Sequence, residues 1–373
     1  MAQLRRIACL LPNLAGGGQE KVTLNLLQGF NQRGLATDLV LADLRGPYRD
    51  RIPTSTRVIN FNQPIVNRAR STLQLTAPLT RYLRQEAPDI LISHLIWTNE
   101  WAIVANIIAG FPSRVIVWEQ MPPTQPPTQI KIAAMRSLYR WANAIVTPSA
   151  GVANYYTHLL NLSPQGVNII PNPVVDTTVT AQAIAPLNHP WFTPDSPPVI
   201  LGIGRLAKQK DFPTLIRAFA QLVSQQPARL VILGEGGQRP HLESLIQQLN
   251  LQDWVSLPGF VSNPYCYLSR AAVFALSSQQ EGLPTVLIEA LACGCPVVAT
   301  DCPSGPRDIL EAGQYGLLVP VGDDRALATA LQTTLAQPRD AARLKARSQD
   351  FAIDRITEQF LNLSHRLLNT RSF

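Results

Sequence analysis

Short runs of apolar residues alternate along the chain with longer segments in which apolar residues recur every three or four positions. Runs of the first kind, which are typical of buried parallel strands, occupy residues 6–11, 89–93, 114–118 and 198–206. Segments of the second kind predict amphipathic helices, for example the one that carries Leu215, Ile216, Phe219 and Leu222. This alternation predicts an α/β fold with doubly wound parallel sheets in both halves of the chain.

The chain has 373 residues, which is too many for one ordinary hydrophobic core. We therefore expect two domains of about 180 residues each, formed by residues 1–180 and 181–351. The boundary is expected within residues 172–198, because prolines interrupt every periodic pattern there. These prolines are Pro173, Pro186, Pro190, Pro194, Pro197 and Pro198.

Two carboxylates, Glu281 and Glu289, lie eight positions apart with Pro284 between them. Pro284 suits the first position of a helix and Gly294 suits the position after its end. A short apolar helix is therefore predicted over about 284–292.

The start of this helix is a candidate binding site. Backbone N–H groups at Gly282 and Leu283 and the positive end of the helix dipole favour a phosphate or an electron-rich sugar oxygen. Glu281, just before this end, is expected to accept hydrogen bonds from ligand hydroxyls, and Glu289 suits a ribose diol. The alternative is that Glu281 only complements the dipole and that Glu289 lies on a solvated face.

A second group of candidate residues follows the strand predicted over 198–206. Arg205 and Lys210 lie in the loop after this strand, and Asp211 is expected to cap the next helix. Ligands bind at the carboxyl ends of strands in open α/β sheets, where two cations suit a diphosphate. The alternative is an ordinary solvated loop with Lys208 as a further surface cation. The Gly202-x-Gly204 pair lacks the third glycine of a dinucleotide fingerprint, which argues against hydride transfer.

These motifs together resemble the retaining glycosyltransferases of family 4. The resemblance is continuous over about 199–320 and rests on residues 204–212, Leu233-Gly234-Glu235-Gly236, the predicted turn at 257–261, and residues 281–300. Residues 300–310 are similar to the members that build polysaccharides and lipid-linked oligosaccharides, with Asp308 where a glutamate is common.

The resemblance implies the GT-B fold, in which two Rossmann-like doubly wound domains face each other across a cleft. It also implies that residues 352–373, with a helix over about 352–368, cross back to the N-terminal domain. It assigns Arg205 and Lys210 to the nucleotide diphosphate, Glu281 to hydroxyls of the donor sugar and Glu289 to the ribose. The other donor-binding residues that it implies are Gly17, Gly204, Pro258, Gly259, Phe260, Gly282, Leu283 and Pro284.

The N-terminal half matches the family less closely. Gly16-Gly17-Gly18 lies between a predicted strand and a predicted helix, so it suits either close approach of a phosphate or sugar or a plain tight turn. His94 follows the strand at 89–93. A lone histidine is more often structural, but this position matches the active-site histidine of the family. Glu119-Gln120 stands where many relatives have His-Asn, so no role is assigned to it.

The function that these residues and the resemblance imply is transfer of a hexose from a nucleotide sugar, expected to be a UDP-sugar, to a glycan or polyprenyl-linked acceptor with retention of configuration. No metal or other cofactor is expected, since an Asp-x-Asp pair is absent and Asp323-Asp324 suits a helix cap. The alternatives are a sugar-nucleotide epimerase or glycan phosphorylase of the same architecture, or a non-catalytic protein that binds sugar nucleotides.

The net charge of +7 arises entirely in the first half, where residues 1–180 carry 16 Lys and Arg against 9 Asp and Glu. This excess predicts an anionic partner. No nucleic-acid-binding motif is present, so an anionic membrane surface is favoured. Its predicted contact is an interfacial helix with leucines on one face and a break at Pro78. Arginines at positions 68, 70, 81 and 84 flank leucines at 73, 75 and 79. The alternative is a solvated helix that packs on the core through these leucines.

The chain contains no apolar run of the roughly 18 residues that span a membrane, and its N-terminus lacks the apolar region of a signal peptide. We therefore expect a cytoplasmic protein, or one that is peripheral on the inner face of the membrane. The cysteines support a reducing compartment and are expected to be buried or idle thiols. They are Cys9, Cys266, Cys293, Cys295 and Cys302.

Overall fold

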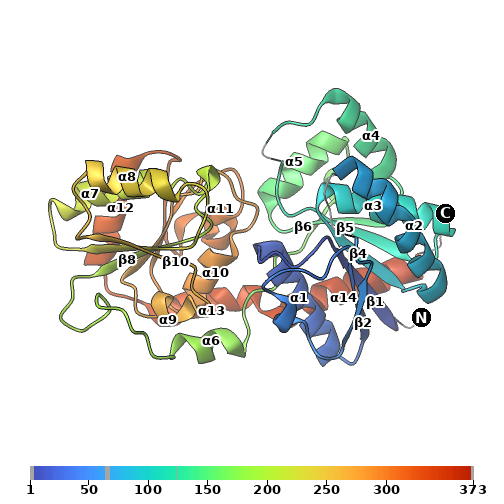
Figure 1. The fold of residues 1–373 in the computed structure, drawn as a ribbon, viewed down its shortest axis with the longest axis horizontal. Helices are drawn as coiled ribbons and strands as arrows, with labels where there is room; N and C mark the ends of the chain where they lie inside the picture. Colours follow the sequence, from blue (N-terminus) through green and yellow to red (C-terminus); the bar gives the residue numbers. More distant parts are fainter. Residues whose placement is uncertain (1–3, 64–67, 124, 371–373) are drawn as a thin grey trace. The chain divides into compact units, whose positions relative to one another are not determined.

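The computed structural model describes residues 4–63, 68–123 and 125–370 (Figure 1). The chain forms two compact units, residues 1–173 with 353–373 and residues 174–352. The chain therefore passes from the first unit to the second between Pro173 and Val174, earlier than the expected boundary between residues 180 and 181. It returns to the first unit at Ile353, the first residue of the last helix.

The first unit contains a seven-stranded parallel sheet with strand order β3-β2-β1-β4-β5-β6-β7. The strands are β1 (Arg6–Leu11), β2 (Ala36–Leu41), β3 (Thr56–Asn60), β4 (Ile90–His94), β5 (Arg114–Trp118), β6 (Ala144–Thr147) and β7 (Asn168–Ile169). The predicted strands at 6–11 and 114–118 are confirmed. The prediction at 89–93 is shifted by one residue, so that His94 is the last residue of β4.

Helices cover both faces of this sheet. They are α1 (Gly18–Gln32), α2 (Arg68–Glu86), α3 (Ile96–Ala109), α4 (Gln129–Tyr139), α5 (Ala150–Leu160) and α14 (Ile353–Asn369). Buried residues of α1 and α14 pack on one face with alternate residues of β1, whereas those of α2, α3, α4 and α5 pack on the other face. This arrangement is the doubly wound architecture that the apolar pattern predicted.

Helix α2 contradicts the predicted interfacial helix. It continues through Pro78 without a break, and Leu75 and Leu79 are only 2% and 1% exposed. Both leucines pack in the core under α2 with Tyr82 and Leu83, because burial against the sheet satisfies the same amphipathic pattern that a membrane surface would. The side chains at 68, 70 and 73 lie outside the described residues.

The second unit contains a six-stranded parallel sheet with strand order β10-β9-β8-β11-β12-β13. The strands are β8 (Val199–Ile203), β9 (Arg229–Leu233), β10 (Val255–Gly259), β11 (Val273–Leu276), β12 (Val297–Thr300) and β13 (Leu317–Val319). The helices are α6 (Thr177–Ala183), α7 (Phe212–Val223), α8 (Arg239–Gln248), α9 (Tyr265–Leu268), α10 (Thr285–Ala292), α11 (Pro306–Ile309), α12 (Asp324–Ala336) and α13 (Ala341–Ser348).

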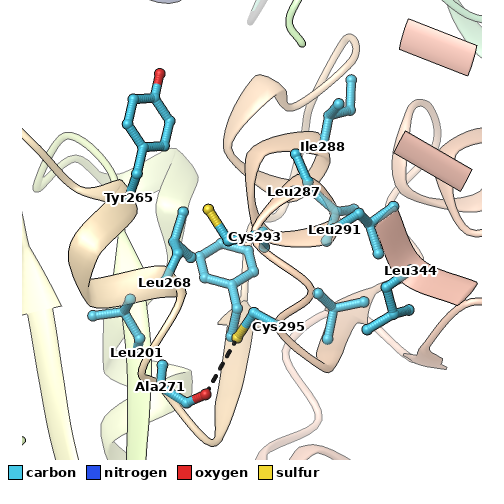
Figure 2. Close-up of a cluster of buried hydrophobic side chains, with 14 of the residues drawn as sticks. Leu201, Tyr265, Leu268, Ala271, Leu287, Ile288, Leu291, Cys293, Cys295 and Leu344 are labelled. Carbon is cyan, nitrogen blue, oxygen red and sulfur yellow. Dashed lines mark hydrogen bonds between the residues drawn. The ribbon is translucent and has the colours of Figure 1, made fainter. Parts of the chain in front are cut away.

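Two hydrophobic cores hold the helices of the second unit. Helices α7, α8 and α12 pack on one face of the sheet, and α6, α9, α10 and α13 pack on the other. Figure 2 shows Leu287 and Leu291 of α10 in the core formed with α6, α9 and α13, close to Leu344 of α13. This packing fixes the position of α10, whose start carries the candidate binding residues.

All five cysteines are free and buried, as the sequence predicted. Cys293 and Cys295 belong to the core drawn in Figure 2, and Cys295 Sγ contacts the carbonyl oxygen of Ala271 at 3.7 Å. Burial raises the pKa of each of these two thiols to about 12. Both therefore remain protonated at neutral pH and are poor nucleophiles and metal ligands.

Helix α14 completes the core of the first unit. Phe360 is fully buried and its ring centroid lies 4.6 Å from that of Trp118 in β5. Helix α1 approaches α14 at Gly29, where a Cβ atom would lie only 2.0 Å from Thr357 Oγ1. The absence of a side chain at this position allows the close approach of the two helices.

Candidate active site

The order of strands in the second sheet identifies where a ligand is expected to bind. The chain runs from β8 outward through β9 to β10 and then returns to β11 on the other side of β8. In open α/β sheets, ligands bind where the carboxyl ends of two such neighbouring strands meet. The loop after β8 carries Arg205 and Lys210, and the loop after β11 leads to Glu281.

Lys210 and Glu281 form an ion pair at this point. Lys210 Nζ lies 2.6 Å from Glu281 Oε1, and Ser278 Oγ donates a second hydrogen bond of 2.6 Å to the same oxygen. The side chain of Glu281 is 9% exposed and that of Lys210 is 19% exposed. Because the contact is largely shielded from water, it holds the ammonium group in a defined position.

Further hydrogen bonds join the two loops. Ser277 Oγ donates to the carbonyl oxygen of Lys210 at 2.8 Å, and Gln209 Nε2 donates to that of Gln280 at 2.6 Å. Ser304, in the loop after β12, donates through its hydroxyl to the carbonyl oxygen of Glu281. The roles of these serines and of the glutamine were not predicted from the sequence, because their only signal was a small or polar side chain beside a predicted site residue.

Glycines allow close backbone contacts at the carboxyl ends of β8, β9 and β10. Gly204 N–H donates to Leu233 O at 3.0 Å, and Gly234 N–H donates to Gly259 O at 2.8 Å. A Cβ on Gly234 would lie 2.0 Å from the carbonyl oxygen of Gly204, so only glycine fits there. A Cβ on Gly204 would lie 3.2 Å from Lys210 Cε, which shows that the stem of this lysine crosses that glycine.

Residues 257–259 of the predicted turn at 257–261 lie in a strand instead. Residues up to Gly259 belong to edge strand β10, and the strand register shifts between Ser256 and Gly259. Gly259 has a φ of +92°, a conformation that suits glycine at a bulge. Pro258 is exposed, which an edge strand tolerates, and the Phe260 side chain beyond it is 68% exposed.

Helix α10 begins at Thr285 with Pro284 as its N-cap residue, one position later than predicted. Gly282 and Leu283 lie immediately before it. Glu289 is only 5% exposed, so the alternative that placed it on a solvated face is wrong. A carboxylate that is buried to this extent requires polar partners, which suits a specific polar role.

The cations of the loop after β8 differ in their surroundings. Arg205 and Lys208 are exposed, whereas Lys210 is partly buried against Glu281. Asp211 occupies the N-cap position of α7 but has a φ of +47°, and its side chain accepts from the Thr214 hydroxyl instead of a backbone N–H group. Asp323 does cap α12, because its side chain accepts from Ala326 N–H at 2.9 Å.

In the first sheet the strand order reverses in the same way, because the chain runs from β1 outward to β3 and then returns to β4 on the other side of β1. His94 at the end of β4 is fully buried, and its Nε2 lies 3.0 Å from Thr23 Oγ1 of α1. Its ring centroid lies 4.7 Å from that of Trp118. Among the described residues, His94 Nδ1 has no hydrogen-bond partner. Sugar hydroxyls reach this ring only if the side chains around it move.

The glycines after β1 lie at the same edge of the first sheet. Gly16 has a φ of +91°, and Gly17 is the N-cap residue of α1. A Cβ on Gly17 would lie 2.6 Å from a carboxylate oxygen of Glu20. That carboxylate therefore lies near the start of α1, where it complements the helix dipole.

Comparisons with known proteins identify the family. The model "Glycosyltransferase Family 4" matches residues 16–177, and "Glycosyl transferases group 1" matches residues 188–351. The chain is 29% identical over 365 residues to N-acetylgalactosamine-N,N'-diacetylbacillosaminyl-diphospho-undecaprenol 4-alpha-N-acetylgalactosaminyltransferase of Campylobacter jejuni, covering 95% of this chain and 97% of the relative. The chain belongs to the family 4 glycosyltransferases.

Solved structures show that this glycosyltransferase has the GT-B fold. Sucrose-phosphate synthase from Thermosynechococcus elongatus superposes with a TM-score of 0.81 at 21% identity, covering 97% of this chain and 99% of the other. HepE of Anabaena in complex with UDP superposes with a TM-score of 0.78 at 19% identity, covering 97% and 100%. Both likenesses extend over nearly the whole chain, so both Rossmann-like units belong to the shared fold.

In this glycosyltransferase, Glu119 is a buried carboxylate that sequence reasoning left without a role. It accepts hydrogen bonds from Asn99 Nδ2 at 2.9 Å, from the Tyr156 hydroxyl at 2.8 Å and from the Tyr139 hydroxyl. Burial raises the pKa of Glu119, and these donors oppose that shift. The carboxylate thus ties α3, α4 and α5 together beyond the end of β5.

The structure brings Lys210, Glu281 and the start of α10 together within the second unit of the glycosyltransferase, whereas Gly17 and His94 belong to the first. In the part of the chain that the structure describes, no group of three or more His, Cys, Asp and Glu side chains is arranged to hold a metal ion. None of the described helices is long and apolar enough to cross a membrane.

We expect the glycosyltransferase to lose stability in acid through His94. Burial lowers the pKa of the ring from 6.5 to about 3. Between these pH values the unfolded chain binds a proton that the folded chain does not, so the free energy of unfolding falls as pH decreases. The slope is at most about 1.4 kcal/mol per pH unit. Urea unfolding at pH 7 and pH 5 should show a smaller difference for His94→Asn than for the wild type, and equal differences would contradict this prediction.

Proposed function

We propose that the chain transfers a sugar from a UDP-sugar to a glycan or lipid-linked glycan acceptor, with retention of anomeric configuration and without a metal ion. The observation that carries this proposal is the shielded Lys210–Glu281 pair, with Arg205 on the same loop, where β8 and β11 end. A positioned cation and a carboxylate at such a point match the two chemical parts of a nucleotide sugar, its diphosphate and its sugar hydroxyls.

The cations stabilise the leaving group in this proposal. As the bond from the anomeric carbon to the diphosphate oxygen breaks, negative charge grows on the diphosphate. Arg205, Lys210 and the backbone N–H groups of Gly282 and Leu283 face this charge, and Pro284 fixes the start of α10. Because Glu281 fixes Lys210 before the donor binds, little reorganisation is needed during the reaction.

The remaining donor contacts follow from the same placement. Among the described residues, Lys210 and Ser278 contact Oε1 of the Glu281 carboxylate, and we assign its Oε2 to a hydroxyl of the donor sugar. Glu289 binds the ribose, and the backbone at Pro258, Gly259 and Phe260 flanks the base. Gly204 lets the stem of Lys210 lie close to the sheet, and we assign Gly17 to the donor as well. His94 remains neutral and positions Thr23 in α1.

Retention arises by attack on the same face of the sugar. The acceptor hydroxyl adds to the anomeric carbon from the side that the diphosphate leaves, and its proton passes to an oxygen of the departing diphosphate. This path requires stabilised charge and excluded water more than a protein nucleophile.

The acceptor class is supported by the Campylobacter relative, whose name specifies a diphospho-undecaprenol-linked sugar. The choice of UDP is supported by the UDP complex of HepE. The free thiols suit a reducing compartment, so we propose a cytoplasmic location at the inner face of the membrane.

The reaction provides the test of this proposal. Purified protein mixed with UDP-sugars and a polyprenyl-diphosphate-linked glycan should release UDP and extend the acceptor, and proton NMR of the product should show the same anomeric configuration as the donor. GDP- and ADP-sugars serve as matched donors that are expected to react more slowly.

Four outcomes would contradict parts of this proposal. Loss of activity in EDTA with recovery in Mg²⁺ or Mn²⁺ would show that the transfer needs a metal ion. An inverted product would contradict same-face attack. Binding of UDP-sugars without transfer to any glycan, or interconversion of the sugars without an acceptor, would favour a binding protein or an epimerase instead.

A further inference from the structure

Three large apolar side chains lie exposed at one place on the first unit. We define Ile108, Phe111 and Trp141 as the aromatic patch. Ile108 and Phe111 are each 50% exposed and Trp141 is 47% exposed. The rings of Phe111 and Trp141 lie 5.7 Å apart between centroids, so the two side chains contact each other. Single exposed apolar residues are common, but two adjoining aromatic rings beside an isoleucine mark a contact surface.

The aromatic patch lies at the amino edge of the first sheet. Helix α3 precedes β5, and α4 precedes β6 (Figure 1). Ile108 is near the end of α3, Phe111 follows α3, and Trp141 follows α4. His94 and the glycines after β1 lie at the opposite, carboxyl edge of the same sheet. The patch is therefore separate from the candidate active-site residues of this unit.

The backbone holds Phe111 outward at an energetic cost. Phe111 has a φ of +60°, directly after Gly110 with a φ of +90°. A left-handed conformation is rare for a bulky aromatic residue and costs roughly 1–2 kcal/mol. Buried Asn106 fixes the loop, because its side chain donates to Ser113 O at 3.0 Å and accepts from Ser113 N–H at 3.3 Å. Strain that is maintained to expose a phenyl ring indicates a function for that ring.

Arginines surround the aromatic patch. Arg84 donates to the carbonyl oxygen of Ile108 at 2.6 Å, and Arg140, the neighbour of Trp141, donates to Ser137 Oγ at 3.2 Å. Arg114, at the start of β5, donates to the carbonyl oxygen of Thr370 at 2.9 Å. Each of these partners is uncharged, so the contacts leave the positive charges uncompensated.

The acidic residues near this edge are already engaged. Glu86 forms ion pairs with Arg6 at 2.7 Å and with Arg57 at 2.8 Å. Asp89 accepts hydrogen bonds from the backbone N–H groups of Arg5 and Arg6. The amino edge therefore presents a net positive surface around the aromatic patch, which accounts for part of the charge excess of the first half of the chain.

We propose that the aromatic patch, with Arg84 and Arg140, docks this enzyme on the surface of an anionic lipid bilayer. Tryptophan and phenylalanine insert at the boundary between headgroups and acyl chains, and arginines at the rim contact anionic headgroups. The proposed membrane contact is therefore this patch and not the face of α2, because Leu75 and Leu79 of α2 are buried. The inference rests on the proposed function only in that a lipid-linked acceptor gives the enzyme a reason to bind membranes.

The test is sedimentation with vesicles of phosphatidylcholine alone or with 30% phosphatidylglycerol, without donor or acceptor. Wild-type protein should bind only the anionic vesicles and should be released at high salt, since charges near the surface are screened. Arg84→Gln/Arg140→Gln should bind at least about tenfold more weakly. Phe111→Asn/Trp141→Gln should lose a similar factor or more.

Matched variants separate docking from folding. Asparagine tolerates the left-handed backbone better than phenylalanine, so Phe111→Asn should keep or raise the melting temperature while it weakens vesicle binding. Arg217→Gln/Arg325→Gln removes two exposed arginines of the second unit, and Ile184→Ser removes a side chain that is 82% exposed there. Both should bind vesicles as the wild type does.

Several results would overturn the proposal. These are failure of the wild type to bind anionic vesicles, undiminished binding of Phe111→Asn/Trp141→Gln, and unfolding of Phe111→Asn. A dimer that dissociates when the patch is substituted would identify a second copy of this chain as the occupant instead. Donor binding, measured by thermal shift with UDP-sugars in the absence of vesicles, is a separate readout, so failure of the proposed function is distinguishable from failure of docking.

Discussion

Replacing Lys210 with methionine should lower turnover by about 10²-fold or more, because it removes an oriented cation from the leaving diphosphate. Methionine keeps much of the stem that crosses Gly204, so the packing against the sheet is retained. Arg205→Ala should cause a loss of similar size, since both residues act on the same developing charge. The measurement is steady-state release of UDP in the presence of acceptor.

Lys208→Ala is the matched control for these two variants, since Lys208 is an exposed cation of the same loop. The turnover of Lys208→Ala should stay within about twofold of the wild type if the loss in the other two variants depends on where the cation lies and not on the net charge of the loop. Because Lys210→Met leaves Glu281 buried without its cation, the double variant Lys210→Met/Glu281→Gln shows whether lost stability contributes. Wild-type turnover in both Lys210→Met and Arg205→Ala would remove the diphosphate assignment.

Phe360→Ala should lower the free energy of unfolding of the first unit by about 3–5 kcal/mol. Phe360 is fully buried against Trp118, and alanine leaves a cavity between α14 and the sheet. Urea unfolding monitored by tryptophan fluorescence reports mainly this unit, because four of the six tryptophans belong to it, namely Trp97, Trp101, Trp118 and Trp141.

The matched control is Phe260→Ala, which truncates a phenylalanine that is 68% exposed. It should change stability by no more than about 0.5 kcal/mol. If Phe360→Ala also changes stability by less than about 1 kcal/mol, the last helix does not support the core of the first unit in the way that its burial indicates.

The elements that sequence patterns predicted well are those in which local periodicity and burial agree. The apolar run at 6–11 became β1 with the expected bounds, and the helix that carries Leu215 and Phe219 buries those residues. A period of two to four residues is a property of neighbouring positions, so a single sequence contains it.

Contacts between distant segments were not predictable in the same way. Lys210 and Glu281 are 71 positions apart, and only the return of the chain from β10 to β11 brings them within 2.6 Å. The leucines of α2 illustrate a second limit, because an amphipathic pattern shows that one face is buried without showing what covers it. The Pro258-Gly259 pair indicated a turn, but an edge strand accommodates both residues at a bulge.

The position of α14 has a consequence for how the chain folds during synthesis. The second unit is continuous in sequence and ends at Ala352, whereas the first unit still lacks the buried residues of α14 at that stage. Ribosomes add about 5–20 residues per second, so the sheet that is synthesised first waits on the order of 10–40 s for its last helix. During this interval the apolar face later covered by Phe360 is exposed, which makes it a natural binding surface for a chaperone.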